Sequence, residues 1–526
     1  MSSLLQKLHL PGRLRPGTSA RARFKAPKAS AAMMVLGAIS IALLMGAVVG
    51  LGAVQLTVAL SGLLLFLPLL FLINTRVLMP LLLVMVFVIQ GSAQYAFNMR
   101  LATWLATMLC GLFFIRAILE LTNRRGSTPA PSRQFPGPGT VITAASLYLL
   151  CYFFSLALGH ATPLQIISTV RFTLPMFGVL FAFYWFNWQE ERITRLWWIL
   201  VMITVLQVPV VVYQHFIMVS TVGWDAISGT FGSGMSAIMV IFAIATLMFV
   251  LARWSRGLTS TSVLVCTTAC VLAVILLGEV KAALVWLPLG VLWILRRRVL
   301  RNVVGFIMYS CLVLAFTAGT YAAYKAMYWK AGAAHAETLA EKLDYISGYA
   351  IDPNNINNRT GEVSRGASMM LWYRDSVSAT KERLIGYGPG ASASSSATGF
   401  GVVAMRYRPL GIAATTVAAL LWDVGVVGLL CYIVFLVTGI VAGFRFVRRG
   451  TASPAILSIV DASVGTLTLL LTTLFYNRAL LDEPTVQLLC FLSLGWIVQC
   501  CRYHDKGESS TVSSASPVAM PAVKTA

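Results

Sequence analysis

The sequence predicts an all-α polytopic membrane protein with about 14 transmembrane helices, within a range of about 12 to 14, and one large, partly helical loop. Two observations lead to this fold class. Of the 526 residues, 58% are hydrophobic and only 11% are charged, whereas soluble globular chains carry about 25% charged residues. The charged residues also gather in short runs beside apolar segments, which is typical of topology signals at membrane boundaries.

Apolar segments recur along the chain at lengths that suit membrane-spanning helices, since one span needs about 20 residues. The first segment follows a basic tail and is too long for the core of a signal peptide, so we interpret it as an uncleaved span. The centres of the fourteen expected spans are Ile41, Leu63, Val84, Leu109, Leu150, Gly178, Leu206, Ile241, Ala269, Pro288, Leu312, Tyr432, Leu467 and Leu492.

Lys and Arg residues are unequally distributed between the two sides of this arrangement. One side holds 26 of the 40 Lys and Arg residues, whereas the short connections of the other side hold only four. Because cytoplasmic connections carry the excess of positive charge, both termini are predicted to be cytoplasmic and the long loop to lie on the opposite face. Topology therefore accounts for the net charge of +22, and no nucleic-acid partner is indicated.

The predicted organisation has five parts. They are a basic cytoplasmic tail (1–30), transmembrane helices 1–11 (31–323), the large loop (324–409), a surface helix with transmembrane helices 12–14 (410–501), and a disordered cytoplasmic tail (502–526). The apolar stretch from Gly411 to Phe444 would make a helix of about 51 Å, against a hydrocarbon core of about 30 Å. We therefore expect Gly411–Leu421 to form a separate helix at the outer surface, with Asp423 at the mouth of the next span.

The large loop is too long for a passive connection and is expected to be functional. Its segment from Glu362 to Leu384 has the spacing of a helix, with Arg365 and Trp372 on one face. The GYGPG turn that follows contains Gly386, Gly388 and Gly390. Such a turn can hold an anion with backbone N–H groups, or it can be a helix stop followed by a flexible linker, which spacing alone favours.

The sequence indicates no metal site and no cofactor. Its nine cysteines lie in or at the ends of apolar segments without a CxxC pair, and its five histidines have no HxxxH spacing. Structural metal sites need about four ligands, so the adjacent Cys500 and Cys501 do not make one by themselves.

Several motifs occur in a suggestive order across the C-terminal two-thirds of the chain. They are RFTLP from Arg171, SGTFGSGMSAIM from Ser228, GEVKAALVWLPLG from Gly278, RGASMMLWYRDSVSATKERLIGYGPG from Arg365, and LLWDVGVVGLL from Leu420. Together they resemble the O-antigen ligase and O-antigen polymerase superfamily of bacterial membrane glycosyltransferases. Ligases of that superfamily usually carry a histidine shortly before the glycine that matches Gly425. That histidine is missing here, and Lys281 stands where many relatives have arginine, which favours a polymerase.

The resemblance implies a metal-independent glycosyltransferase of the bacterial inner membrane whose large loop is periplasmic. Its substrate would be an oligosaccharide on an undecaprenyl-pyrophosphate carrier, and its product an O-antigen, a capsule or an exopolysaccharide. A chain-length regulator and export machinery are implied as partners. The alternatives are a ligase that transfers glycan to a lipid A core, a transporter or flippase for lipid-linked glycans, and a membrane scaffold without enzymatic activity. Short connections and charges within the spans would suit a transporter, and this chain shows the reverse.

Candidate site residues follow from the chemistry of this transfer. Arginine forks bind phosphate oxygens in pairs, and a base helps to deprotonate the acceptor hydroxyl. Each candidate also has an ordinary interpretation, such as a solvated helix face, a cation at the headgroups, or pairing of Asp375 with Arg374. The expected catalytic residues are Arg365, Asp375 and Asp423. The expected substrate-binding residues are Arg171, Lys281, Arg359, Arg374, Trp372, Gly386, Gly388 and Gly390.

Overall fold

The protein is represented by a computed structural model that describes residues 46, 75–97, 102–123, 137–185, 188–218, 227–232, 234–327, 348, 352–395 and 399–514. The basic tail 1–30 and the two expected spans centred on Ile41 and Leu63 lie outside these ranges. From Asn74 onward the chain forms one compact unit.

This unit is an all-α membrane protein, and the strands within the described ranges have only two residues each. Nine helices within the described ranges are long and apolar enough to cross a membrane. These candidate spans are Val77–Tyr95, Pro138–Leu158, Gln165–Trp185, Glu190–Met218, Ser236–Trp254, Val303–Met327, Gly425–Arg449, Pro454–Thr473 and Pro484–Arg502.

Nine expected span centres fall on these nine helices. The centres at Leu109, Ala269 and Pro288 fall on the further apolar helices α5 (Ala102–Asn123), α11 (Thr261–Leu277) and α12 (Ala283–Val299). The helices that carry the nine candidate spans are α3 (Thr75–Val84), η1 (Met85–Ile89) and α4 (Gln90–Phe97) in succession, α6 (Pro138–Leu158), α7 (Pro163–Trp185), α8 (Glu190–Tyr213) with η2 (Gln214–Met218), α10 (Ser236–Trp254), α13 (Val303–Met327), α19 (Gly425–Arg449), α20 (Pro454–Thr473) and α22 (Pro484–Ser514).

A short non-helical segment, Ile227–Gly232, is buried against these helices. Thr230 donates its hydroxyl proton to the carbonyl oxygen of Phe87 at 2.7 Å and its backbone N–H to Gln207 at 2.8 Å. Gln214 accepts two further backbone N–H groups of the same segment. A backbone without helical hydrogen bonds is stable among apolar helices only where its polar groups are paired in this way.

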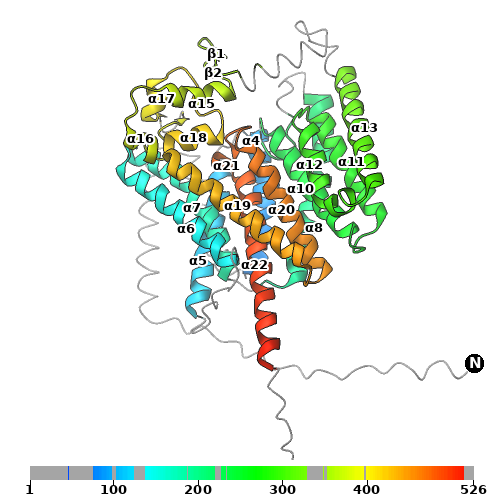
Figure 1. Cartoon of the computed structure of the whole chain (residues 1–526). Coiled ribbons are helices and arrows are strands. Elements are labelled where there is room, and N and C mark those ends of the chain that lie inside the picture. The colour runs from blue at the N-terminus through cyan, green and yellow to red at the C-terminus, as the bar shows by residue number, and fades with distance from the viewer. Residues whose placement is uncertain are drawn as a thin grey trace, which may run out of the picture. The chain divides into compact units, whose positions relative to one another are not determined.

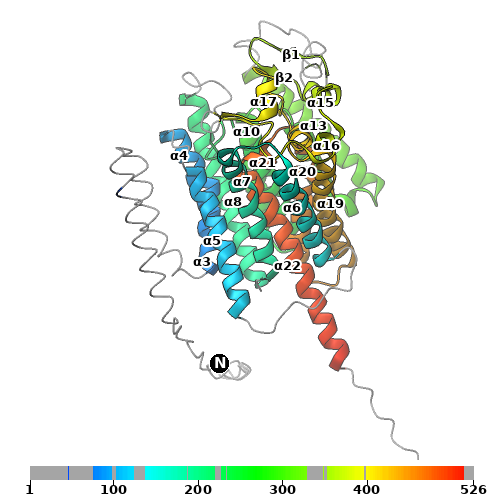
Figure 2. The same ribbon diagram turned by 90° about the vertical axis from the view of Figure 1, so that its left-hand side faces the viewer.

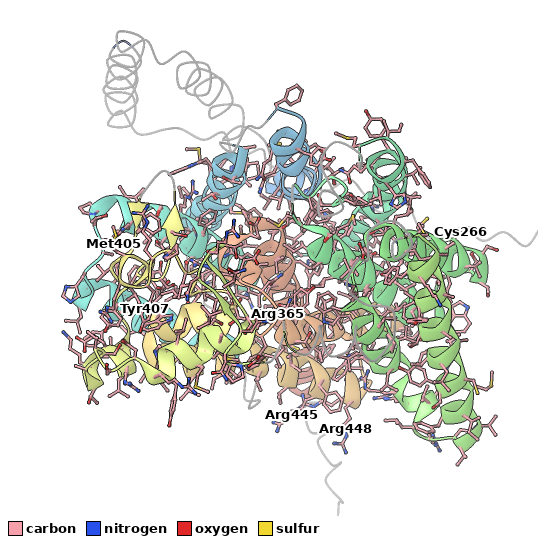
Figure 3. The ribbon with its side chains drawn as sticks, turned by 90° about the horizontal axis from the view of Figure 1, so that it is seen from above. Cys266, Arg365, Met405, Tyr407, Arg445 and Arg448 are labelled. Atoms are coloured by element: carbon pink, nitrogen blue, oxygen red, sulfur yellow. The ribbon has the colours of Figure 1, made fainter. Side chains whose placement is uncertain are left out.

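The end of the unit opposite the loop is rich in arginine and is held together by charge. The buried carboxylate of Asp461 in α20 pairs with Arg256 at 2.7 Å and with Arg296 of α12 at 2.9 Å. At the same end, Ser453 donates to Glu190 at 3.0 Å. Figure 3 shows Arg445 and Arg448 of α19, further members of this group of arginines. Within the described ranges, the basic connections around Arg256, Arg296 and Arg448 therefore gather at one end of the helices.

The large loop lies at the other end (Figures 1 and 2). It ties directly to the helices, since Gln165 of α7 donates to the carbonyl oxygen of Phe400 at 3.0 Å. Its elements are β1 (Ile356–Asn357), β2 (Glu362–Val363), α15 (Arg365–Arg374), α16 (Thr380–Ile385), β3 (Ser394–Ser395), β4 (Gly399–Phe400) and α17 (Val402–Arg406). Strands β1 and β2 pair antiparallel, as do β3 and β4.

The single helix expected from Glu362 to Leu384 is wrong in its extent. Ser364 caps the start of α15, its hydroxyl accepting the N–H of Ala367. Asp375 ends α15, because its carboxylate accepts the N–H of Val377 and bends the chain there. Aspartate and serine favour such turns over helix interiors. The predicted stop at Gly386, which ends α16, is confirmed.

Two expectations near the C-terminus also need correction. A separate helix does precede the span, but it covers Thr416–Asp423 (α18) where Gly411–Leu421 was expected, and all of its residues are buried. The segment 502–526 was expected to be disordered, yet α22 continues to Ser514. A helix already formed extends at little cost, since only its nucleation is unfavourable.

Candidate functional site

The GYGPG turn is bound to the junction between α18 and α19. Backbone N–H groups of Tyr387 and Gly388 donate to the carbonyl oxygens of Trp422 and Asp423, at 2.9 and 3.0 Å. The carbonyl oxygen of Tyr387 in turn accepts the N–H of His160, just after α6, at 3.1 Å. The turn is therefore hydrogen-bonded to the helices beneath it, which argues against the flexible-linker interpretation.

The carboxyl group of Asp423 accepts hydrogen bonds from backbone N–H groups at and just after the end of this turn. Its Oδ2 accepts the N–H of Gly390 at 3.0 Å, and its Oδ1 accepts the N–H of Ser392 at 2.8 Å. Burial raises the pKa of Asp423, and the charge of Arg478 together with the two N–H groups limits this rise. The turn does hold a carboxyl group, as its spacing allowed, but the group belongs to the protein itself.

Glycine is required at the two ends of the turn. Gly386 and Gly390 have φ angles of 85° and 89°, in the left-handed region that side chains disfavour. A Cβ atom on Gly386 would overlap the carbonyl group of Asp423, and one on Gly390 would lie 2.7 Å from the hydroxyl of Thr169. These glycines serve close packing of the loop on the helices.

A cavity of about 170 Å³ opens beside Asp423 where the loop meets the helices. Its walls come from α6, α7, the stretch after the GYGPG turn, the junction of α18 and α19, and the connection between α20 and α22. The charged residues that line it are Arg171, Arg478, Asp423 and Asp482. The side chains of Tyr148 and Tyr152 of α6 form an aromatic part of the cavity wall.

Arg171 enters the cavity from α7, about two turns after the start of that helix. Its guanidinium lies 4.2 Å from the ring centres of both Trp104 and Phe172, so two aromatic faces hold it. Its Nε atom is buried and has no hydrogen-bond partner in the described part of the chain. The rings stabilise this cation, and Arg171 lines the cavity in which an anion would bind.

Arg478 faces the same cavity from the connection after α20. Its Nε atom lies 2.5 Å from Oδ2 of Asp482, as an ion pair without the alignment of a good hydrogen bond. Burial lowers the pKa of Arg478, but the charges of Asp482 and Asp423 outweigh burial and leave it raised. Arg478 therefore remains positively charged beside the cavity.

Asp375 occupies a separate, fully bonded position within the loop. It is only 4% exposed. Its carboxylate accepts hydrogen bonds from Arg406 at 3.0 Å, from Tyr407 at 2.9 Å, and from the hydroxyl of Ser378. Burial would raise the pKa of Asp375, but these donors together lower it. The partner of Asp375 is therefore Arg406 of α17, and Asp375 does not line the cavity.

Arg365 and Trp372 are half-buried but belong to different contacts. The guanidinium of Arg365 lies 4.2 Å from the ring centre of Tyr476, beside the end of α20 (Figure 3). Trp372 packs against Tyr387 and other buried residues of the loop, and Arg383 lies over its ring at 5.7 Å. The expected pairing of these two residues in one substrate surface is therefore not evident from their contacts.

The loop has a small hydrophobic core of its own, which we call the loop core. Leu371, Trp372, Tyr407 and Leu410 pack around it. Its buried members are Tyr387, Ala391, Val403, Ile412 and Trp422. One of them, Trp422, comes from α18, so the loop is completed by the helix beneath it.

The remaining expected cations are exposed and do not line the cavity. Lys281 lies just before α12, Arg359 in the turn between β1 and β2, and Arg374 at the end of α15. Of the eleven expected site residues, the cavity thus brings together Arg171 and Asp423, with Gly386, Gly388 and Gly390 in the adjoining turn.

Arg478 and Asp482 were not among the expected site residues. Their signal was present in the sequence, because Arg478 is one of only four cations in the short connections of the side poor in Lys and Arg, and Asp482 follows one helical turn later. Across the described ranges, no three side chains of His, Cys, Asp or Glu come together as ligands for a metal ion. No protein-family model matches this sequence, and no curated protein matches it.

Proposed function

We propose that this protein is a polysaccharide polymerase of the bacterial inner membrane. It transfers glycan from an undecaprenyl-pyrophosphate carrier to a second lipid-linked oligosaccharide, on the periplasmic side. Its product is an O-antigen, a capsule or an exopolysaccharide. In this proposal both termini are cytoplasmic, the large loop is periplasmic, and Ile41 and Leu63 mark two of fourteen spans.

The observation that carries the proposal is Arg171 in the cavity. Its guanidinium lies between aromatic rings, makes no hydrogen bond to any residue in the described ranges, and shares the cavity with Arg478. Pyrophosphate is a good leaving group when fixed cations hold its developing charge. A cavity with two arginines beside apolar helices suits a pyrophosphate whose lipid chain remains in the membrane.

The transfer itself requires few groups. The acceptor hydroxyl oxygen forms a bond to the anomeric carbon of the donor sugar while the bond from that carbon to pyrophosphate breaks. The electron pair leaves with the pyrophosphate, which Arg171 and Arg478 stabilise, and the hydroxyl proton passes to a base. Asp375 is poorly placed for the base because its carboxylate already accepts four hydrogen bonds within the loop.

Activity of the purified protein on lipid-linked oligosaccharide tests the proposal. Arg171→Ala should lower the rate of polymer formation by about 100- to 1,000-fold, the usual cost of losing one charge-assisted contact in a transition state. Arg171→Lys should recover part of the rate, since an ammonium cannot bind two oxygens as a fork. Arg301→Ala, at an exposed arginine before α13, is the matched control. Normal polymer from Arg171→Ala would refute the assigned site.

A deletion strain distinguishes the competing functions. A polymerase mutant should accumulate carrier with a single repeat unit on the outer leaflet. Accumulation on the inner leaflet would instead identify a flippase, and accumulation of long carrier-linked polymer would identify a ligase. Reporter fusions at Gly361 and Ser127 test the orientation, since only a periplasmic reporter should be active at Gly361.

A further inference from the structure

The four charged side chains of the cavity sum to zero if all are ionised, which is unfavourable for binding a multiply charged anion. Asp423 is only 6% exposed and is fixed by the N–H groups of Gly390 and Ser392. The Asp482 side chain is 41% exposed and makes one close contact, to Nε of Arg478. Of the two acids, Asp482 is therefore the one that can move away at low cost.

Arg478 has N–H groups that can bind an anion in addition to Asp482. Its side chain is 22% exposed, and its close contact with Asp482 is made through Nε. Within the described ranges, its two Nη atoms make no hydrogen bond. A guanidinium binds phosphate best through two parallel N–H groups, so the outer edge of this fork is available while Asp482 holds its inner nitrogen.

We propose that Asp482 is a resident counter-ion of Arg478 that the pyrophosphate group of a ligand displaces. This inference rests on the proposed function for the identity of the lipid, but the anion exchange is a property of the cavity alone. Without ligand, the ion pair neutralises Arg478 and keeps it oriented toward the cavity. With ligand, the two cations face the phosphate oxygens and Asp482 turns to solvent. The exchange selects for dianionic groups, which gain more from two arginines than a single phosphodiester does.

The test uses the full chain in detergent with inorganic pyrophosphate as the probe. Removing the competing carboxylate in Asp482→Asn should tighten pyrophosphate binding by about two- to five-fold, the size expected for a half-exposed ion pair. Arg478→Gln should weaken binding by at least about ten-fold. Arg478→Lys retains the charge and serves as a second variant whose folding is expected to be unaffected, and it should bind more weakly than the native protein.

A double-mutant cycle separates exchange from a general change in charge. If Asp482 acts through Arg478, Asp482→Asn should have no effect in the Arg478→Gln background. The same gain in both backgrounds would overturn the proposal, as would unchanged binding by Asp482→Asn alone. Glu362→Gln, which removes an exposed acid of β2, is the charge-matched control and should bind as the native protein does.

Competition identifies the source of the anion. Undecaprenyl pyrophosphate in micelles should displace the inorganic probe, whereas phosphatidylglycerol should not. Equal displacement by phosphatidylglycerol would overturn the assignment to pyrophosphate. If the cycle shows coupling but purified protein forms no polymer, the exchange site stands and the proposed function fails. If polymer forms without coupling between Arg478 and Asp482, the exchange alone fails.

Discussion

The Oδ2 atom of Asp423 accepts a hydrogen bond of 3.0 Å from the backbone N–H of Gly390. This bond joins the loop to the helix junction on which it rests. Asp423→Ala would leave that N–H and the N–H of Ser392 buried without a partner, at a cost of about 1–3 kcal/mol each. We expect a lower thermal unfolding temperature in detergent and faster proteolysis of the loop.

Asp423→Asn should be milder, because its amide oxygen still accepts one of the two N–H groups. Glu362→Ala, at an exposed position in β2, provides the control and should unfold as the native protein does. Native stability in Asp423→Ala would show that the turn is held by other contacts.

Asp375 should make stability fall in acid. Its pKa in the folded protein lies below the ordinary value of 3.8, because hydrogen bonds from Ser378 and Tyr407 and the charge of Arg406 outweigh burial. A depressed pKa stabilises the fold above pH 3.8, and this contribution is lost as pH falls further. Unfolding followed between pH 6 and pH 3 should show this decline, and Asp375→Asn should be less stable at pH 6 with a flatter profile. An unchanged slope in the variant would contradict the assignment.

Glu483 should have the opposite effect in a different pH range. Burial, reinforced by the neighbouring charge of Asp482, raises its pKa from 4.5 to about 8. The folded protein therefore binds this proton more tightly than the unfolded chain, and stability falls as pH rises from 4.5 through 8. Glu483→Gln should remove this dependence and be more stable than the native protein at pH 9. A native protein whose stability rises over that interval would refute it.

Cys151 of α6 and Cys431 of α19 provide a direct test of helix packing. Their sulfur atoms are 3.6 Å apart. With the other seven of the nine cysteines replaced by serine, copper phenanthroline should link these two. After cleavage at a protease site introduced between residues 330 and 345, the fragments should remain joined until they are reduced. Cys266 of α11, which is exposed, can be retained with Cys431 in place of Cys151. This control pair also lies on opposite sides of the cleavage site, and it should leave the fragments separable.

The sequence predicted the helices better than it predicted the site, for physical reasons. Hydropathy depends on local composition, so Leu150, Gly178 and Tyr432 were placed correctly on spans. The break at Asp375 was missed because a helical spacing runs across it. The break itself is local, because the Asp375 carboxylate accepts the N–H of Val377. The contacts of Arg406 and Tyr407 that bury this carboxylate are tertiary and leave no local pattern.

The site was partly predictable for the same reason. Arg171 and Asp423 were singled out because they lie in motifs that resemble the superfamily and because the transfer needs a cation and a base. Arg478 matters because the fold brings it to the same cavity as Arg171. The sequence around Arg478 contains no pattern that predicts this proximity. Conversely, Arg374 lies within the most suggestive motif, yet the fold leaves it exposed at the end of α15.

The loop core has a consequence for how this protein can be divided and recombined. Hydropathy places a boundary near residue 410, but Trp422, beyond that boundary, is fully buried in the loop core. A loop excised at residue 409 would lose Trp422, the largest buried side chain of the loop core. A loop transplanted into another scaffold would pack on a helix that lacks this side chain. Because α18 also contributes Leu420 and Asp423 to the cavity, the loop and α18 form one transferable module. Chimeras should exchange them together, with their junction placed at Gly425.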